Sequence, residues 1–215
     1  QGDTGGIWRR LQWGAVLELF VLDCRSERAN GQYISTEQMD WLKAGLLNST
    51  ARFKIICNSV PITDMSAMIG AAQAEDRWQG HPEQRVEILG HIEHQGIEGV
   101  LWITGDVHFG QIGWVSPEGQ IGHSAWEVYC GPTGSFLNPV AYYYVGNDPQ
   151  YDQVIYDYNW VRFECDPVQV TVRVQHLNDD GESLSDQLLL KILNTSSCSE
   201  EYFCNCHGRV QKKDL

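Results

Sequence analysis

The sequence has no apolar run near the roughly 20 residues that a membrane-spanning helix needs. Basic residues are also scarce, with 15 Lys and Arg against 28 Asp and Glu and a formal net charge of −13. Such a chain repels nucleic-acid phosphates and anionic lipid surfaces. The only cationic cluster is the tail Arg209, Lys212 and Lys213, which is too short to outweigh the acidic residues. We therefore expect neither a nucleic-acid-binding surface nor a membrane span.

Internal repeats and low-complexity runs are absent too, so a solenoid is excluded and 215 residues suffice for one sizeable core. The N-terminal sequence QGDTGGIWRR lacks a signal-peptide pattern, and the chain begins with Gln1 instead of Met. We expect a processed or partial chain, from which any targeting segment has been removed or in which none existed.

The positions of the cysteines indicate the redox environment in which the protein folds. Four of the seven cysteines lie in or beside predicted strands as candidate buried residues, namely Cys24, Cys57, Cys130 and Cys165. The other three, Cys198, Cys204 and Cys206, lie in a polar tail, which suggests disulfides and an oxidising compartment. A zinc knuckle with His207 is the alternative, although CxC is not the usual CxxC spacing. N-glycosylation sequons at Asn48 and Asn194 also fit a secreted glycoprotein.

The first half of the chain alternates strands with helices. Residues 17–23, 53–58 and 99–105 are apolar runs typical of buried strands. A helix is predicted after Ser35, which with Gln38 fits a capping box. A second helix is predicted from Pro82, with Val86, Leu89 and Ile92 on one side, to a cap at Gly96. This order predicts an α/β fold with a mostly parallel sheet.

The second half of the sequence has a pattern that predicts antiparallel strands. Residues 111–116 and 124–130 flank a Pro-Glu-Gly turn, and the stretch VQVTVRV alternates apolar and polar residues as a half-solvated strand does. Residues 178–181 form the turn of a closing hairpin. The aromatic stretches WRRLQW and AYYYVG are interpreted as core and loop packing.

Polar side chains follow each of the three predicted parallel strands. They are Asp23 and Arg25, then Asn58 and Ser59, then Asp106 and His108 of the sequence GDVH. Because active groups gather beyond the carboxyl ends of such strands, we expect these residues to meet. Asp, Asn and His together are ligands for hard or borderline divalent and trivalent metals.

Each residue also has a plainer interpretation. Asp23 could cap the following turn and pair with Arg25 or Arg28, and Asn58 could satisfy backbone groups of its loop. His81, His91 and His94 are expected on loops and the surface.

Several segments, in order, resemble the PhoD-like alkaline phosphatases of the metallophosphoesterase class. RRLQWGAVLELFVLDCRSER resembles the family pattern R-x-x-x-W-G … F-x-x-L-D-x-R-x-x-R, and RWQGHPEQR resembles W-x-G-[YF]-P-x-x-R with His81 in place of the usual aromatic residue. GDVH matches the family's metal motif, and the likeness runs from Trp8 to Leu190. It implies a sandwich of two mixed β-sheets flanked by helices.

The resemblance further implies hydrolysis of phosphate monoesters or diesters by a metal-bound hydroxide or oxide, with iron and calcium as the associated metals. Asp106 and His108 would be metal ligands, and Asn58 and Ser59 would line the substrate site. The residues assigned to catalysis are Asp23, Arg25 and Arg28, which would orient the pocket or contact phosphate.

The family's other metal-ligand motifs precede the matched segment. Residues 1–194 are therefore expected to be the C-terminal portion of a PhoD-like domain, followed by a cysteine-containing tail at 195–215. The expected partners are a phosphoester substrate and the N-terminal half of the same protein, which could be a separate chain. The alternative function is a non-catalytic structural or binding subunit on a partial phosphatase fold. A third hypothesis is a metal-binding module whose metal site lies in the cysteine-containing tail.

Overall fold

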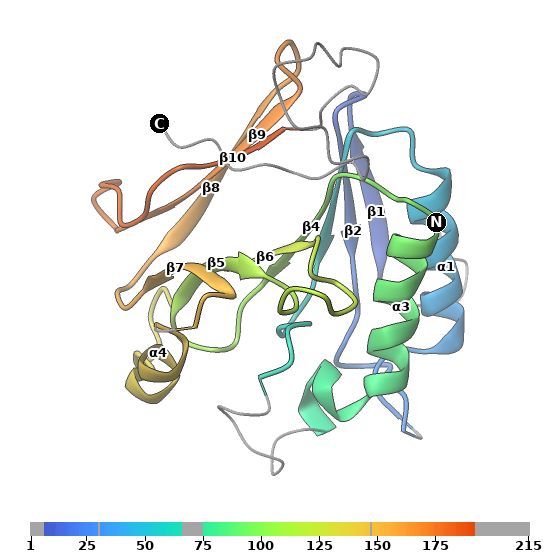
Figure 1. The fold of residues 1–215 in the computed structure, drawn as a ribbon, viewed down its shortest axis with the longest axis horizontal. Helices are drawn as coiled ribbons and strands as arrows, with labels where there is room; N and C mark the ends of the chain where they lie inside the picture. Colours follow the sequence, from blue (N-terminus) through green and yellow to red (C-terminus); the bar gives the residue numbers. More distant parts are fainter. Residues whose placement is uncertain (1–6, 30, 66–74, 147, 192–215) are drawn as a thin grey trace.

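The strands form two sheets of unequal size (Figure 1). The computed structural model describes residues 7–29, 31–65, 75–146 and 148–191, which form a seven-stranded sheet ordered β1-β2-β3-β4-β6-β5-β7 and a three-stranded sheet ordered β10-β9-β8. The strands are β1 (Arg9–Trp13), β2 (Leu17–Val21), β3 (Phe53–Cys57), β4 (Val100–Thr104), β5 (Gly110–Trp114), β6 (Trp126–Tyr129), β7 (Tyr151–Ile155), β8 (Trp160–Asp166), β9 (Thr171–Leu177) and β10 (Leu188–Lys191).

The large sheet is mixed and the small sheet is antiparallel. Strands β2, β3, β4 and β6 pair in parallel, whereas β1, β5 and β7 pair antiparallel with their neighbours. All three strands of the small sheet pair antiparallel. The expected α/β sandwich of two sheets with helices is confirmed, and only the second sheet differs from the expected mixed pairing.

Helix α1 (Thr36–Asn48) begins at the predicted cap, because the hydroxyl oxygen of Ser35 accepts a hydrogen bond from the backbone N–H of Gln38 at 3.1 Å. The reciprocal half of the predicted capping box is wrong. The side chain of Gln38 instead bonds the backbone of Asp23, accepting from its N–H at 2.8 Å and donating to its carbonyl at 3.1 Å. Gln38 thus ties α1 to the loop after β2.

Helix α3 (Pro82–His94) has Pro82 in its first turn, and Gly96 follows its end with a φ of 61°. The prediction of an apolar side is confirmed for Leu89 and Ile92, which are buried together with Ile88, and is wrong for Val86, which is 48% exposed. The short 3-10 helix η2 (Trp78–Gly80) precedes it. A further helix, α4 (Pro139–Val145), contains most of the stretch AYYYVG, which the sequence analysis interpreted as core and loop packing.

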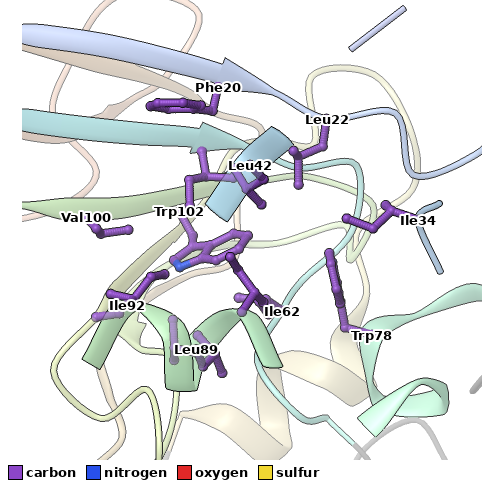
Figure 2. Packing of buried hydrophobic residues seen from close by; sticks show 14 of the residues in the cluster. Phe20, Leu22, Ile34, Leu42, Ile62, Trp78, Leu89, Ile92, Val100 and Trp102 are labelled. Atoms are coloured by element: carbon purple, nitrogen blue, oxygen red, sulfur yellow. The ribbon is translucent and has the colours of Figure 1, made fainter. Parts of the chain in front are cut away.

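A hydrophobic core joins α1 and α3 to one face of the large sheet. Figure 2 shows Trp78 and Trp102 packed among aliphatic side chains from the helices and strands, and both indoles have 0% exposure. Trp102 comes from β4 and Trp78 from η2, with ring centroids 6.4 Å apart. The core therefore anchors η2 next to the parallel strands.

The opposite face of the large sheet packs against the small sheet. Strand β9, from the predicted alternating stretch, buries Val172 and Val174 against Ile55, Leu101 and other large-sheet residues. The predicted hairpin turn lies between β9 and β10, and the N–H of Gly181 donates to the carbonyl of Asn178 at 3.1 Å.

Strand β1 was not predicted, and all five of its residues are exposed. The core role predicted for WRRLQW holds for Trp8, which is 5% exposed, and is wrong for Trp13, which is 72% exposed. Strand β7, which pairs with β5 at the edge of the large sheet, was also not predicted. Short edge strands gain little from apolar patterning, so their sequences carry a weak signal.

Among the described cysteines, Cys24, Cys57, Cys130 and Cys165 are all free thiols. Cys24 is buried as expected, whereas Cys165 is exposed. The tail cysteines, His207, Asn194 and the boundary at residue 194 lie outside the described residues. In the described part of the chain, no helix is both long and apolar enough to span a membrane.

Candidate functional site

The predicted convergence of strand ends is seen in the geometry. Because β2, β3 and β4 are neighbours and run parallel, their carboxyl ends reach the same edge of the sheet. The thiol of Cys24, after β2, lies 3.0 Å from the side-chain oxygen of Asn58, after β3. The guanidinium of Arg25 lies 3.1 Å from the carboxylate of Asp106, after β4. Residues from three separate strands therefore share one site.

Asp23 shapes the loop that carries Arg25. Its side chain is 4% exposed and accepts hydrogen bonds from the backbone N–H of Arg25 at 3.3 Å, from that of Ser26 at 3.0 Å and from the Ser26 hydroxyl. Burial raises the pKa of this carboxyl, but the hydrogen bonds outweigh burial and the net pKa is lowered. These contacts are those of the turn cap in the alternative interpretation of Asp23. The pairing with Arg25 or Arg28 in that alternative is wrong, because the guanidinium groups of both arginines pair instead with Asp76, and that of Arg25 also with Asp106.

Five charged side chains gather at this edge, and we call them the arginine cluster: Arg25, Arg28, Arg77, Asp76 and Asp106. Arg25 donates through Nη1 to both carboxylate oxygens of Asp76 at 2.8 Å and through Nη2 to Asp106. Arg28 pairs with Asp76 as well. Burial raises the pKa of the Asp76 carboxyl, but the guanidinium groups of Arg28 and Arg25 reverse this and lower it.

Arg77 completes the cluster, and sequence reasoning missed it. Its Nη2 donates to Oδ2 of Asp106 at 3.0 Å, and its side chain is only 10% exposed. The available signal was its place directly before Trp78, which is fully buried and fixes the backbone beside it (Figure 2). Asp76, the other unpredicted member, lies just before Arg77.

Asn58 faces inward. It is 8% exposed, and its side-chain oxygen accepts from the Cys24 thiol and, at 3.2 Å, from the indole N–H of Trp78. Its amide nitrogen donates to the carbonyl of Val60. Asn58 thus joins the loop after β3 to η2, as in the alternative in which it satisfies its surroundings. Ser59, the next residue, is exposed at the same edge.

The GDVH segment has an uncommon backbone. Asp106 and His108 have φ values of 74° and 65°, in the left-handed region that residues other than Gly adopt uncommonly. Val107 between them is 3% exposed and anchors the segment in the interior. The His108 ring is half-buried and meets Phe136 edge-on at 4.6 Å between centroids. His108 is therefore not sealed in an apolar core.

The described residues do not by themselves fit a metal centre. Among residues that the structure places, no three His, Cys, Asp or Glu side chains form a group that could hold an ion. Asp106, the expected first ligand, has one carboxylate oxygen engaged by Arg25 and the other by Arg77. The electrostatics of this edge are those of a guanidinium site, which suits anions.

Two surface cavities, of about 340 and 480 Å³, lie elsewhere. One is lined by Trp114, Glu118 and His123 among others, and the second by residues that include Thr36 and Glu87. Neither lining contains a member of the arginine cluster. The candidate site is therefore identified from its charged side chains.

Comparisons with known proteins agree with the fold and the motifs. Residues 1–159 match the model of the family described as PhoD-like phosphatase. Alkaline phosphatase D of Bacillus subtilis (strain 168) is 28% identical over 122 aligned residues, which cover 47% of this chain and 21% of that protein. A solved structure titled "Structure of PhoD" superposes with a TM-score of 0.68 at 18% identity, over 86% of this chain and 42% of the other. The chain thus spans less than half the length of either relative.

Proposed function

The chain belongs to the PhoD-like phosphatase family, and from this premise we propose that it takes part in the hydrolysis of phosphate monoesters or diesters. The observation that carries the proposal is the arginine cluster at the carboxyl edge of β2, β3 and β4. Phosphoryl transfer needs groups that neutralise charge on the non-bridging oxygens, and guanidinium groups do this bidentately.

In this proposal Arg25 and Arg28 bind the phosphoryl group. Their side chains are 49% and 32% exposed, so a substrate reaches them from solvent. Each exchanges part of its bonding to Asp76 for bonding to phosphoryl oxygens and stabilises the charge that develops in the transition state. Asp23 acts as a positioning residue by holding the loop under Arg25, and Ser59 lines the substrate site beside Asn58.

Metal dependence is a separate proposal that comes from the GDVH segment. Asp106 and His108 could supply two ligands, and iron and calcium are the ions that the family resemblance implies. The remaining ligands would come from outside the described residues, because those residues form no group of three ligands. A metal ion held there would supply a Lewis acid that activates water against phosphorus.

The partner that we propose is the N-terminal half of the family fold. Leu17 and Leu19 lie on the face that packs against the small sheet, and at the β1 edge of this face their partners Trp13 and Leu11 are still 72% and 46% exposed. An apolar sheet face is stable when another layer covers it, and exposed apolar patches mark contact sites. More than half of the solved relative lies outside the matched region, which supports this occupant.

The non-catalytic alternative has one observation in its favour, namely that both oxygens of Asp106 are paired with arginines. The test is hydrolysis of p-nitrophenyl phosphate and bis(p-nitrophenyl) phosphate, with and without a chelator, by this chain alone and with an added N-terminal half. We expect hydrolysis with the added half, its loss in chelator and a large loss in Arg25→Ala. Arg162→Ala, on β8, is the matched control, because Arg162 is exposed and its partners among the described residues, Glu164 and Gln175, lie on its own sheet. If no mixture hydrolyses either ester, the proposed hydrolysis is refuted and the non-catalytic structural or binding role is favoured.

We also propose secretion and N-glycosylation. Asn48, in the first sequon, is exposed at the end of α1 and accessible to modification. Intact-mass measurement of the protein from a secreting eukaryotic host, before and after glycosidase treatment, tests both. An unchanged mass would remove the glycoprotein assignment.

A further inference from the structure

We propose that three exposed aromatic rings beside His108 bind the leaving group of the substrate and favour phosphate esters whose leaving group carries a planar aromatic ring. The rings belong to Phe136, Tyr142 and Tyr156, and we call them the aromatic patch. The inference rests on the proposed function, because it assigns a substrate class to the same edge of the sheet. It concerns the leaving group and not the phosphoryl group.

The aromatic patch lies where the edge that carries the candidate site continues. Strand β6 runs parallel to β4, and β7 runs parallel to β6 because both pair antiparallel with β5. The loops after β6 and β7 therefore leave the same edge of the large sheet as the loops after β2, β3 and β4. Phe136 lies between β6 and α4, and Tyr156 directly follows β7. Helix α4, which contains Tyr142, lies against β7 (Figure 1).

Hydrogen bonds hold the two aromatic loops against the GDVH segment and against each other. The backbone N–H of Asn138 donates to the carbonyl of His108 at 3.1 Å, and its side-chain amide donates to that of Val107 at 3.3 Å. Asn159 joins the second loop to the first, since its side chain accepts from the N–H of Gly131 at 3.1 Å and donates to the carbonyl of Gly131 at 2.9 Å. Both aromatic loops are thus fixed relative to the GDVH segment.

The rings of the aromatic patch are open to solvent. Phe136, which meets the His108 ring edge-on, is 72% exposed. Tyr142 and Tyr156 stack on each other with centroids 5.0 Å apart and planes at 34°, and they keep 40% and 41% exposure. Exposed apolar groups that lie together mark binding sites, and aromatic rings accept another ring in offset-stacked or edge-on geometry.

The position next to His108 assigns the aromatic patch to the leaving group. Arg25, which binds the phosphoryl group in the proposed function, contacts Asp106 at 3.1 Å. His108 follows Asp106 by two residues in the same segment, and its ring contacts Phe136. A substituent that extends from the phosphoryl group past His108 therefore meets the patch.

Charge excludes an anionic occupant of the patch. Residues 131–160 contain no Lys or Arg, and they contain Asp148, Asp152 and Asp157. This segment attracts neither a second phosphate, nor a nucleic-acid backbone, nor an anionic lipid surface. The occupant that fits is the uncharged planar part of a small phosphate ester, either an aryl group or a nucleobase.

The test compares esters that share the phosphoryl group and differ in the leaving group. Phenyl phosphate and cyclohexyl phosphate have rings of similar size, but only the first is aromatic. Adenosine 5′-monophosphate and ribose 5-phosphate differ in the nucleobase. Isothermal titration calorimetry measures their binding to this chain, alone and with the N-terminal half, in excess chelator. Because ring contacts add to the effect of buried area, phenyl phosphate should bind about 2- to 10-fold more tightly than cyclohexyl phosphate.

Variants locate the preference. Phe136→Leu and Tyr156→Leu keep an apolar side chain and remove a ring, so each should lower the ratio of the two affinities by about twofold or more. Tyr156→Phe keeps the ring and should keep the ratio. Trp13→Leu is the matched control, because Trp13 is 72% exposed and β1 lies at the opposite end of the large sheet. Inorganic phosphate, which has no leaving group, should bind equally to all variants.

Circular dichroism checks the fold of each variant, and if one Leu variant does not fold, the other decides. A preference for the aromatic ester in either pair supports the inference, and the larger preference identifies an aryl group or a nucleobase. The inference is overturned if no ester binds, if both pairs bind without preference, or if neither Leu variant lowers the ratio. Unchanged ratios with weaker association of the N-terminal half would identify the patch as a protein interface instead.

The two proposals fail in different ways. An aromatic preference in binding without hydrolysis of any ester would refute the proposed function alone. Hydrolysis of phenyl phosphate with equal affinity for cyclohexyl phosphate and no effect of the nucleobase would refute this inference alone.

Discussion

Trp78 is the residue that joins the hydrophobic core to the candidate site, so its truncation should affect both. The indole is fully buried, lies 4.6 Å from the ring of Tyr33 between centroids, and donates to Asn58. Its backbone neighbour Arg77 reaches Asp106. Trp78→Ala therefore removes the anchor of η2 and leaves a void under the arginine cluster.

The magnitude follows from burial. Truncating a buried Trp to Ala costs about 3–5 kcal/mol, because the void is only partly filled by relaxation. For a domain of this size each kcal/mol lowers the melting temperature by roughly 2–4 °C, so a decrease of about 6–20 °C is expected. Trp13→Ala is the matched control, since Trp13 is 72% exposed, and should change stability by no more than about 0.5 kcal/mol.

Urea unfolding followed by far-ultraviolet circular dichroism measures both variants, and phosphate titration below the transition measures the site. Trp78→Ala should also weaken phosphate binding at temperatures where it is folded, because Arg77 loses its support. Equal stability of the two Trp variants would refute the core assignment. A destabilised Trp78→Ala that binds phosphate normally would refute the coupling between core and site.

Three further predictions concern other parts of the chain. Ser35→Ala should cost about 0.5–2 kcal/mol in urea unfolding, because it removes the acceptor that caps α1; an unchanged midpoint would contradict the cap. The pKa of Asp76 is lowered in the fold, so its contribution is present above the unfolded value near 3.9 and is lost as the pH falls through the folded one. Asp76→Asn should accordingly remove part of the acid-side loss of stability in unfolding curves from pH 2 to 6, and identical pH slopes would argue against the pairing. Burial raises the pKa of Cys24 to about 12, whereas Cys165 is exposed, so iodoacetamide should label Cys165 and spare Cys24 in the native protein. Peptide mapping checks this, and native labelling of Cys24 would refute its burial.

Much of the fold could be predicted from local pattern. The apolar runs at β2, β3 and β4 and the intervening helices define parallel units, and parallel strands place their carboxyl ends at one edge. This topological rule was enough to bring together the loops that carry Arg25, Asn58 and Asp106 without any knowledge of side-chain contacts. The family motifs in their order added the likeness that the comparisons confirm.

The edge strands and side-chain partners could not be predicted in this way. Strand β1 has no buried residue and only two apolar ones, Leu11 and Trp13, which is too short an alternation to mark a strand. Gln38 occupies a capping-box position, yet its amide bonds Asp23, 15 residues away. The choice between these partners depends on where α1 is placed against β2, which no local pattern contains.

By itself, then, the sequence determined the class of fold, the meeting of three strand ends and the likeness to phosphatases, because each depends on short-range periodicity or on motif order. Only the tertiary structure decided that Asp106 lies between two guanidinium groups, since Arg25 and Arg77 lie 81 and 29 positions from it in the chain. It also decided that the ring of Phe136 lies against that of His108, because contacts between side chains depend on the packing of distant segments.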